Sequence, residues 1–133
     1  MLAENLEIAR QWVAKAQNDL LNADNNLNAQ QTPYDTVCFH CQQAAEKFLK
    51  AYLAAYGEAS PHTHDLLLLL EKVFPFSPEA KNIRESLVLL MPYAIEVRYP
   101  DDGFQPTLED AQEARDAAEQ VLTWLRANLP TIF

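Results

Sequence analysis

The sequence predicts an all-α protein, folded as an up-and-down antiparallel bundle of four to five helices. Leu and Ala contribute 19 residues each, against 6 Val, 4 Ile and 2 Gly, and unbranched side chains lose little rotamer freedom in a helix. Apolar residues recur at steps of three and four, in windows that prolines separate. No strand-like alternation competes with this pattern.

Length and charge restrict the classes of function. The 133 residues suit one domain with its own core, and we expect residues 1–133 to form it. The net charge of −9 repels phosphate backbones and excludes a general DNA coat protein, although a local basic site remains compatible with it. The run Leu66 to Leu70 is far shorter than the ~20 apolar residues of a membrane span. With only two cysteines and no signal-like start, we expect a cytoplasmic protein that does not contact membranes.

Three helices are expected in the first half of the chain. The first covers residues 6–27, where one apolar stripe persists for three heptads. The second begins after Pro33 and runs to about Tyr56, where Gly57 supplies a left-handed stop. The third is short and covers residues 63–73.

Two more helices follow. Ser77 is expected to cap the fourth, with Pro78 at its first position and an apolar stripe that reaches Val97. Pro92 should kink this helix, because its ring removes a backbone hydrogen bond. The fifth is expected to begin at Thr107 as its N-cap. The side chains that it should bury are Ala111, Ala114, Ala118, Val121, Leu125 and Leu129.

The second helix carries the most chemical information. At 100° per residue, its apolar side chains share one face, whereas His40, Gln43, Lys47 and Lys50 gather on the face roughly opposite. An imidazole, an amide and two ammonium groups are the donors that a phosphate or a nucleobase requires. The alternative is an ordinary solvated face.

Cys38 and Cys41 have the C-x-x-C spacing in the same helix. A redox pair of this type follows a strand, and none is expected here. A zinc site would need a second ligand pair, and His62 and His64 are the only other histidines besides His40. We therefore expect buried structural thiols, and the sequence calls for no metal and no cofactor.

Two further polar clusters each allow two interpretations, a binding site or a purely structural role. His62 to Asp65 could attract an anion at a helix N-terminus, with His64 and Asp65 in the first turn, or could simply cap that helix through Thr63 or Asp65. Arg98, Tyr99 and Asp101 could bind a phosphate and a base, or could form an Arg–Asp pair with the tyrosine packed over it.

These residues resemble a known family. The phrase from Cys38 to Ala51, CFHCQQAAEKFLKA, is similar to the signature helix of the HEPN domain family (higher eukaryotes and prokaryotes nucleotide-binding). Three weaker elements agree in order and spacing. They are Trp12 with Ala16, Asp19, Leu20 and Ala23, then Thr63 to Leu66, then Arg98 to Asp101.

The resemblance implies a helical bundle, commonly a homodimer, and a partner that is typically a minimal nucleotidyltransferase, in systems that behave as toxin–antitoxin pairs. Many members are metal-independent ribonucleases with an Arg and a His separated by four to six residues. Counting from Arg98, the matching positions hold Gly103, Phe104 and Gln105, and no other Arg of this sequence has a suitably spaced His. Because imidazole is the usual proton-transfer group near neutral pH, ribonuclease activity is disfavoured.

The leading hypothesis is a non-catalytic or weakly catalytic helical homodimer that binds a nucleotide or a short RNA, or docks a nucleotidyltransferase, through a cleft lined by polar residues. Arg98 would bind phosphate, Tyr99 would stack on the base and Asp101 would orient Arg98. The supporting donors would be His40, Lys47, Lys50 and His64. A metal-independent ribonuclease toxin is one alternative. A module that only dimerises or binds a partner protein is the other, with Leu67, Leu68 or Trp124 as candidates for an uncovered apolar patch.

Overall fold

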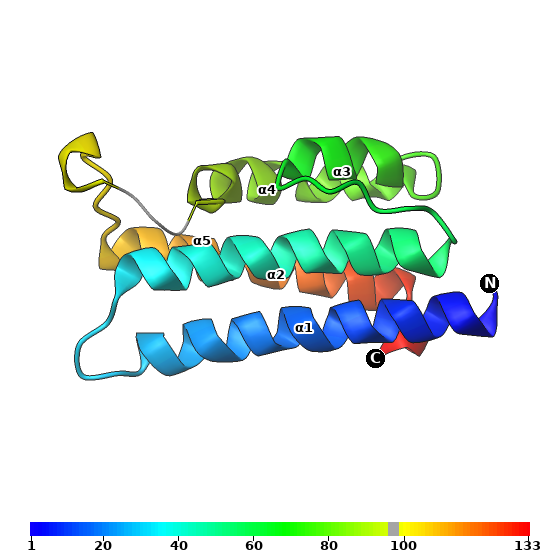
Figure 1. Cartoon of the computed structure of the whole chain (residues 1–133), viewed down its shortest axis with the longest axis horizontal. Helices are drawn as coiled ribbons and strands as arrows, with labels where there is room; N and C mark the ends of the chain where they lie inside the picture. Colours follow the sequence, from blue (N-terminus) through cyan, green and yellow to red (C-terminus); the bar gives the residue numbers. More distant parts are fainter. Residues whose placement is uncertain (96–98) are drawn as a thin grey trace.

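The computed structural model describes residues 1–95 and 99–133 and confirms the all-α prediction (Figure 1). Its α-helices are α1 (Ala3–Leu27), α2 (Tyr34–Ala55), α3 (Leu66–Val73), α4 (Arg84–Leu90) and α5 (Leu108–Asn128). Single turns of 3-10 helix lie at η2 (Met91–Tyr93), η3 (Pro100–Asp102) and η4 (Pro130–Ile132), and a longer one, η1 (Pro78–Ile83), precedes α4. No strand occurs within the two described ranges.

Helix α2 is the centre of the bundle. It runs antiparallel to α1, lies against α5 on another side, and carries α3 and α4 on a third (Figure 1). Small side chains on α2 allow this close approach from several directions, since Ala44, Ala45 and Ala51 are fully buried. One continuous hydrophobic core therefore surrounds a single helix.

Two of the three predicted caps, Gly57 and Thr107, are confirmed. Gly57 adopts φ +74°, and its N–H donates to the carbonyl of Ala54 while Glu58 N–H donates to Leu53, which closes α2 with a Schellman motif. At the start of α5, Asp110 N–H donates to Thr107 Oγ1 over 3.2 Å, and Thr107 N–H donates to Asp110 Oδ2 over 2.9 Å. These two bonds form a capping box.

The third helix begins later than predicted. Helix α3 starts at Leu66, so His64 precedes it and Asp65 is its N-cap. Asp65 Oδ1 accepts hydrogen bonds from the N–H groups of Leu67 and Leu68, and Thr63 Oγ1 accepts one from Asp65. The capping interpretation of this cluster is therefore confirmed, and the side chain of His64 is free to point elsewhere.

The fourth helix is shorter and less regular than predicted. Ser77 and Pro78 do open it, but Ser77 makes no side-chain cap bond and the first six residues form the 3-10 helix η1. The α-helix ends at Leu90 instead of kinking at Pro92, because the proline lacks the N–H that would continue the ladder. In the apolar stripe predicted for this helix, Leu87 and Leu90 are buried, while Val97 lies outside the described residues.

The exposed apolar side chains differ in part from those expected. Trp124 is buried and its ring centroid lies 4.9 Å from that of Tyr52, so the prediction that it belongs to an uncovered patch is wrong. Leu68 is exposed and Leu67 is half-buried. Within the described ranges, no helix is both long and apolar enough to span a membrane.

Candidate functional site

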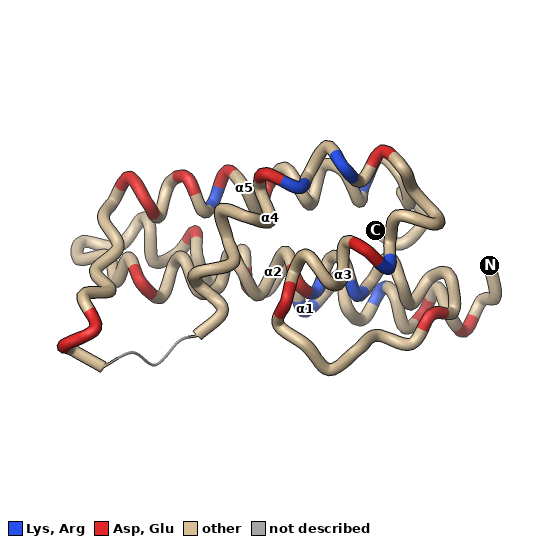
Figure 2. Tube along the Cα trace, turned by 90° about the horizontal axis from the view of Figure 1, so that it is seen from above, with Lys and Arg blue, Asp and Glu red and all other residues tan. Residues whose placement is uncertain are grey.

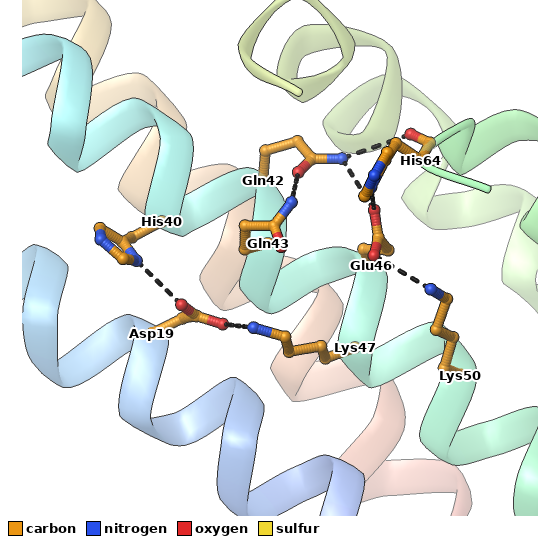
Figure 3. A network of polar contacts seen from close by, with 8 residues as sticks. All are labelled: Asp19, His40, Gln42, Gln43, Glu46, Lys47, Lys50 and His64. Atoms are coloured by element: carbon orange, nitrogen blue, oxygen red, sulfur yellow. Dashed lines mark hydrogen bonds and ion pairs between the residues drawn. The ribbon is translucent and has the colours of Figure 1, made fainter. Parts of the chain in front are cut away.

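The polar face of α2 is covered by neighbouring segments of the chain. Lys50 is buried, and His40, Gln43 and Lys47 are half-buried, because α1 and the segment before α3 lie over them (Figure 3). The alternative of an ordinary solvated face is therefore wrong. We call the line along which α1 and α2 meet at this face the α1–α2 seam; it includes Asp19, His40 and Lys47.

Asp19 is the first of two buried carboxylates on this face. Its Oδ1 lies 2.8 Å from His40 Nδ1, and its Oδ2 accepts a hydrogen bond of 2.5 Å from Lys47 Nζ (Figure 3). One carboxylate on α1 thus holds an imidazole and an ammonium group of α2, two turns apart.

Glu46 is the second, and it is only 3% exposed. Its Oε1 lies 2.8 Å from His64 Nδ1, and its Oε2 accepts a hydrogen bond of 3.1 Å from Lys50 Nζ (Figure 3). Gln42 donates from Nε2 to the His64 carbonyl over 3.4 Å and lies 3.5 Å from Glu46 Oε1, while Gln43 donates to Gln42 over 2.7 Å. Glu46 thereby ties α2 to the segment before α3.

The two carboxylates determine what the histidines can do. An ionised carboxylate only accepts hydrogen bonds, so each Nδ1 must carry the proton that is shared with Asp19 or Glu46. The second ring nitrogen, Nε2, makes no hydrogen bond within the described residues. The lysines neutralise the carboxylates, so the cluster is uncharged when both imidazoles are neutral.

The other half of the predicted site is not joined to this cluster. Arg98 lies outside the described residues. Tyr99 is 79% exposed, and Asp101 is exposed in η3. No polar contact among the described residues links Tyr99 or Asp101 to His40, Lys47, Lys50 or His64. A shared hollow formed by the two groups therefore remains a prediction.

Cys38 and Cys41 are fully buried and free, which confirms the expectation of structural thiols. Burial is the largest cause that raises the pKa of each thiol, in both cases to about 12. The thiolate is the nucleophilic form, so neither side chain is suited to redox chemistry. No three His, Cys, Asp or Glu side chains within residues 1–95 and 99–133 are grouped to hold a metal ion.

We expect the thiols to resist iodoacetamide at pH 8 in the native protein and to react fully in urea. An unfolded cysteine loses its proton near pH 8.5, whereas the pKa of these buried thiols is about 12, so ionisation of the thiols in the unfolded chain favours the unfolded state as the pH rises between the two values. Below about pH 8.5 the thiols are protonated in both states, and the free energy of unfolding keeps its full value. Above that pH only the folded form binds these protons, so the free energy of unfolding falls progressively. At pH 9.5 the loss should be on the order of 1 kcal/mol per thiol. Urea titrations of the wild type and of a Cys38→Ala/Cys41→Ala variant should therefore show a steeper alkaline decline in the wild type, and equal slopes would contradict the burial of the thiols.

Comparison with known proteins identifies the family. The sequence model of the HEPN domain matches residues 9–128. The chain belongs to the HEPN family. Its fold is similar to the crystal structure of an archaeal HEPN homologue, with a TM-score of 0.72 and 25% sequence identity over 91% of this chain and 97% of the other. No curated protein matches the sequence significantly.

Three polar residues of this HEPN chain were not predicted as members of the site. Gln42 and Glu46 are buried in the middle of the signature phrase, and Asp19 belongs to the upstream element of the family resemblance. The spacing of Glu46 and Lys50, four residues apart on a helix, could have revealed their ion pair. The contacts of Asp19 with α2 had no comparable signal, because they span 21 and 28 residues.

Proposed function

We propose that this HEPN protein binds a nucleotide or a short RNA without cleaving it, at the α1–α2 seam and the adjoining Glu46 cluster. The observation that carries the proposal is that two buried carboxylates each hold one imidazole by Nδ1 and one ammonium group. Four cationic or ionisable donors are thereby fixed close to the covered polar face of α2. Such fixed donors suit a phosphate-bearing ligand.

The donors retain capacity for a ligand. Each ammonium group has three N–H donors, and one contact to a carboxylate is found for Lys47 and one for Lys50. Each Nε2 accepts a hydrogen bond when its imidazole is neutral and donates to a phosphate oxygen when the ring takes up a second proton. The side chain of His64 is 69% exposed and therefore offers its Nε2 directly to solvent.

Absence of cleavage is proposed from the sequence, which lacks the Arg and His spacing of the ribonucleases in this family. Ribonuclease activity is the second candidate, because an imidazole held by a carboxylate is also the arrangement of a general base. RNA recovered intact after prolonged incubation with the protein would favour binding alone. Fragments that disappear in the His40→Ala and His64→Ala variants would establish the enzyme.

ATP or a short single-stranded RNA should raise the melting temperature of the wild type. A ligand at 100 times its Kd adds about 2.7 kcal/mol to the free energy of unfolding, which is a shift of several degrees for a domain of this size. His64→Ala should weaken binding about 10- to 100-fold, because a hydrogen bond to a charged group contributes about 1.5–3 kcal/mol. Isothermal titration at a temperature where both proteins are folded measures the affinities.

His62→Ala is the matched control. It removes an imidazole from the same segment, two residues away, that makes no polar contact in the described structure. If His62→Ala and His64→Ala weaken the affinity equally, the Glu46 cluster is not the binding site. Arg98→Ala tests the other half of the predicted binding site. If this variant loses binding, the site includes Arg98.

We further propose that the protein is a cytoplasmic homodimer that pairs with a nucleotidyltransferase in a toxin–antitoxin type system. Membership of the HEPN family supports this assignment, and the two free, buried cysteines fit a reducing compartment. Exposed Leu68, Val88 and Leu89 on α3 and α4 offer apolar surface for a protein partner. A tight protein complex combined with no ligand binding at millimolar concentration would instead favour a module that only binds a partner.

A further inference from the structure

A groove of about 310 Å³ continues the α1–α2 seam towards the N-terminal end of α1. Asn5, Ile8 and Trp12 line it from α1, at steps of three and four residues that place them on one face. Ala54 and the turn over residues 57–60 line it from the other side. Its volume lies at the lower end of the ~300–1,000 Å³ of small-ligand sites, so it suits one ring system more than an extended ligand.

Trp12 connects this groove to the Glu46 cluster. Lys50 Nζ lies over the indole ring, 5.5 Å from its centroid, and the same ammonium group donates to Glu46. The half-buried ring is therefore held by a cation that is itself held by a buried carboxylate. A rigid indole beside a groove is a stacking platform.

The groove also contains unused polar groups. The Oγ of Ser60 is shielded from solvent and has no hydrogen-bond partner among the described residues, a costly state that rotation of the side chain towards a ligand would relieve. The amide of Asn5 lies beside Gly57, where a Cβ would come within 3.1 Å of its Nδ2. A hydroxyl and an amide next to an aromatic ring match the edge of a planar heterocycle.

We propose that this groove binds a nucleobase, stacked on Trp12 and hydrogen-bonded by Ser60 and Asn5. Glu58 on the rim disfavours a phosphate at this end, so the phosphates of a nucleotide would point along the seam towards Lys47 and His64 of the adjoining Glu46 cluster. The direction of the phosphates rests on the proposed function. The base pocket does not, because a nucleoside without phosphate can occupy it.

The test uses the full chain with Trp124→Phe, in which Trp12 is the one remaining tryptophan. Titration with adenosine and with uridine should quench the fluorescence of Trp12 saturably for at least one of them. Equilibrium dialysis of that nucleoside should give the same affinity for the wild type and for Trp124→Phe, which is the matched control. Trp12→Phe should retain binding, whereas Trp12→Leu should weaken it at least about tenfold.

Ser60→Ala keeps the proposal testable if Trp12→Leu does not fold. This variant removes a hydroxyl that has no partner, so its melting temperature should equal or exceed that of the wild type. Its affinity for the nucleoside should nevertheless fall about threefold to tenfold. Unchanged affinity in Ser60→Ala would overturn the pocket, and so would unchanged affinity in a folded Trp12→Leu variant.

The outcomes separate this inference from the proposed function. If neither nucleoside binds at millimolar concentration while ATP or RNA still stabilises the protein, the base pocket is wrong and the proposed function stands. If a nucleoside binds through Trp12 but His64→Ala leaves the affinity for ATP unchanged, the pocket stands and the phosphate site must lie elsewhere. If no nucleoside, nucleotide or RNA binds, both are wrong.

Discussion

Replacing Glu46 with alanine should lower the free energy of unfolding by about 3–5 kcal/mol. The ammonium group of Lys50 would lose its counter-charge while its side chain is only 11% exposed, and an uncompensated buried charge is strongly destabilising. The amide of Gln42 and the imidazole of His64 would each lose a partner as well. Urea denaturation at pH 7, followed by circular dichroism, measures the change.

Two further variants distinguish the effect of the unpaired buried charge from the effect of removing any carboxylate. Glu71→Ala removes an exposed carboxylate and should cost less than about 0.5 kcal/mol. The double variant Glu46→Gln/Lys50→Met should recover much of the loss, because replacing a buried ion pair by groups of similar volume is often neutral. If Glu46→Ala proves as mild as Glu71→Ala, the Glu46 cluster does not hold the bundle together.

Leu49→Ala should destabilise the protein by about 2–5 kcal/mol, whereas Leu21→Ala should cost less than about 0.5 kcal/mol. The two substitutions remove the same atoms. Leu49 is 0% exposed in the C-terminal half of α2, and Leu21 is 57% exposed on α1. The difference therefore measures burial and the cavity that remains, without a change in chemistry.

Comparable m-values in urea for both variants would show that the extent of unfolding is unchanged. Similar losses of stability in Leu49→Ala and Leu21→Ala would refute the placement of α2 at the centre of the fold.

Much of the fold could be predicted because local sequence determines where helices start and stop. Gly57 and Thr107 have caps whose chemistry operates over a few residues, and both act as predicted. The effect of Pro92 was harder to predict, because a proline that lacks an N–H can either kink a helix or end it. Helix α4 stops at Leu90, and the described chain continues as a 3-10 turn.

The candidate site was predictable only in part. Periodicity placed His40, Lys47 and Lys50 on one face of α2, but it does not reveal which neighbour covers that face. The pairing of Asp19 with Lys47 joins two helices across 28 residues, and that of His64 with Glu46 spans 18. Such contacts depend on how helices pack, and the period of a single helix carries no information about them.

The acidic residues of the chain are unevenly distributed over the fold. Acidic residues recur along α5 (Figure 2), whereas on the polar face of α2 each carboxylate is matched by an ammonium group. The overall charge of −9 is therefore carried by other surfaces, and it argues less strongly against a phosphate-bearing ligand at the seam than the total suggests.

A helix enclosed on several sides cannot exchange its amide hydrogens with water unless its neighbours separate first. We expect α2 to belong to the last part of the chain to open, while residues 58–65, with few backbone hydrogen bonds, exchange through local fluctuations. Because His64 is fastened to Glu46, this quickly exchanging segment is anchored to the slowest one. A ligand in the groove or at the Glu46 cluster would accordingly be detected first as slower deuterium uptake over residues 58–65.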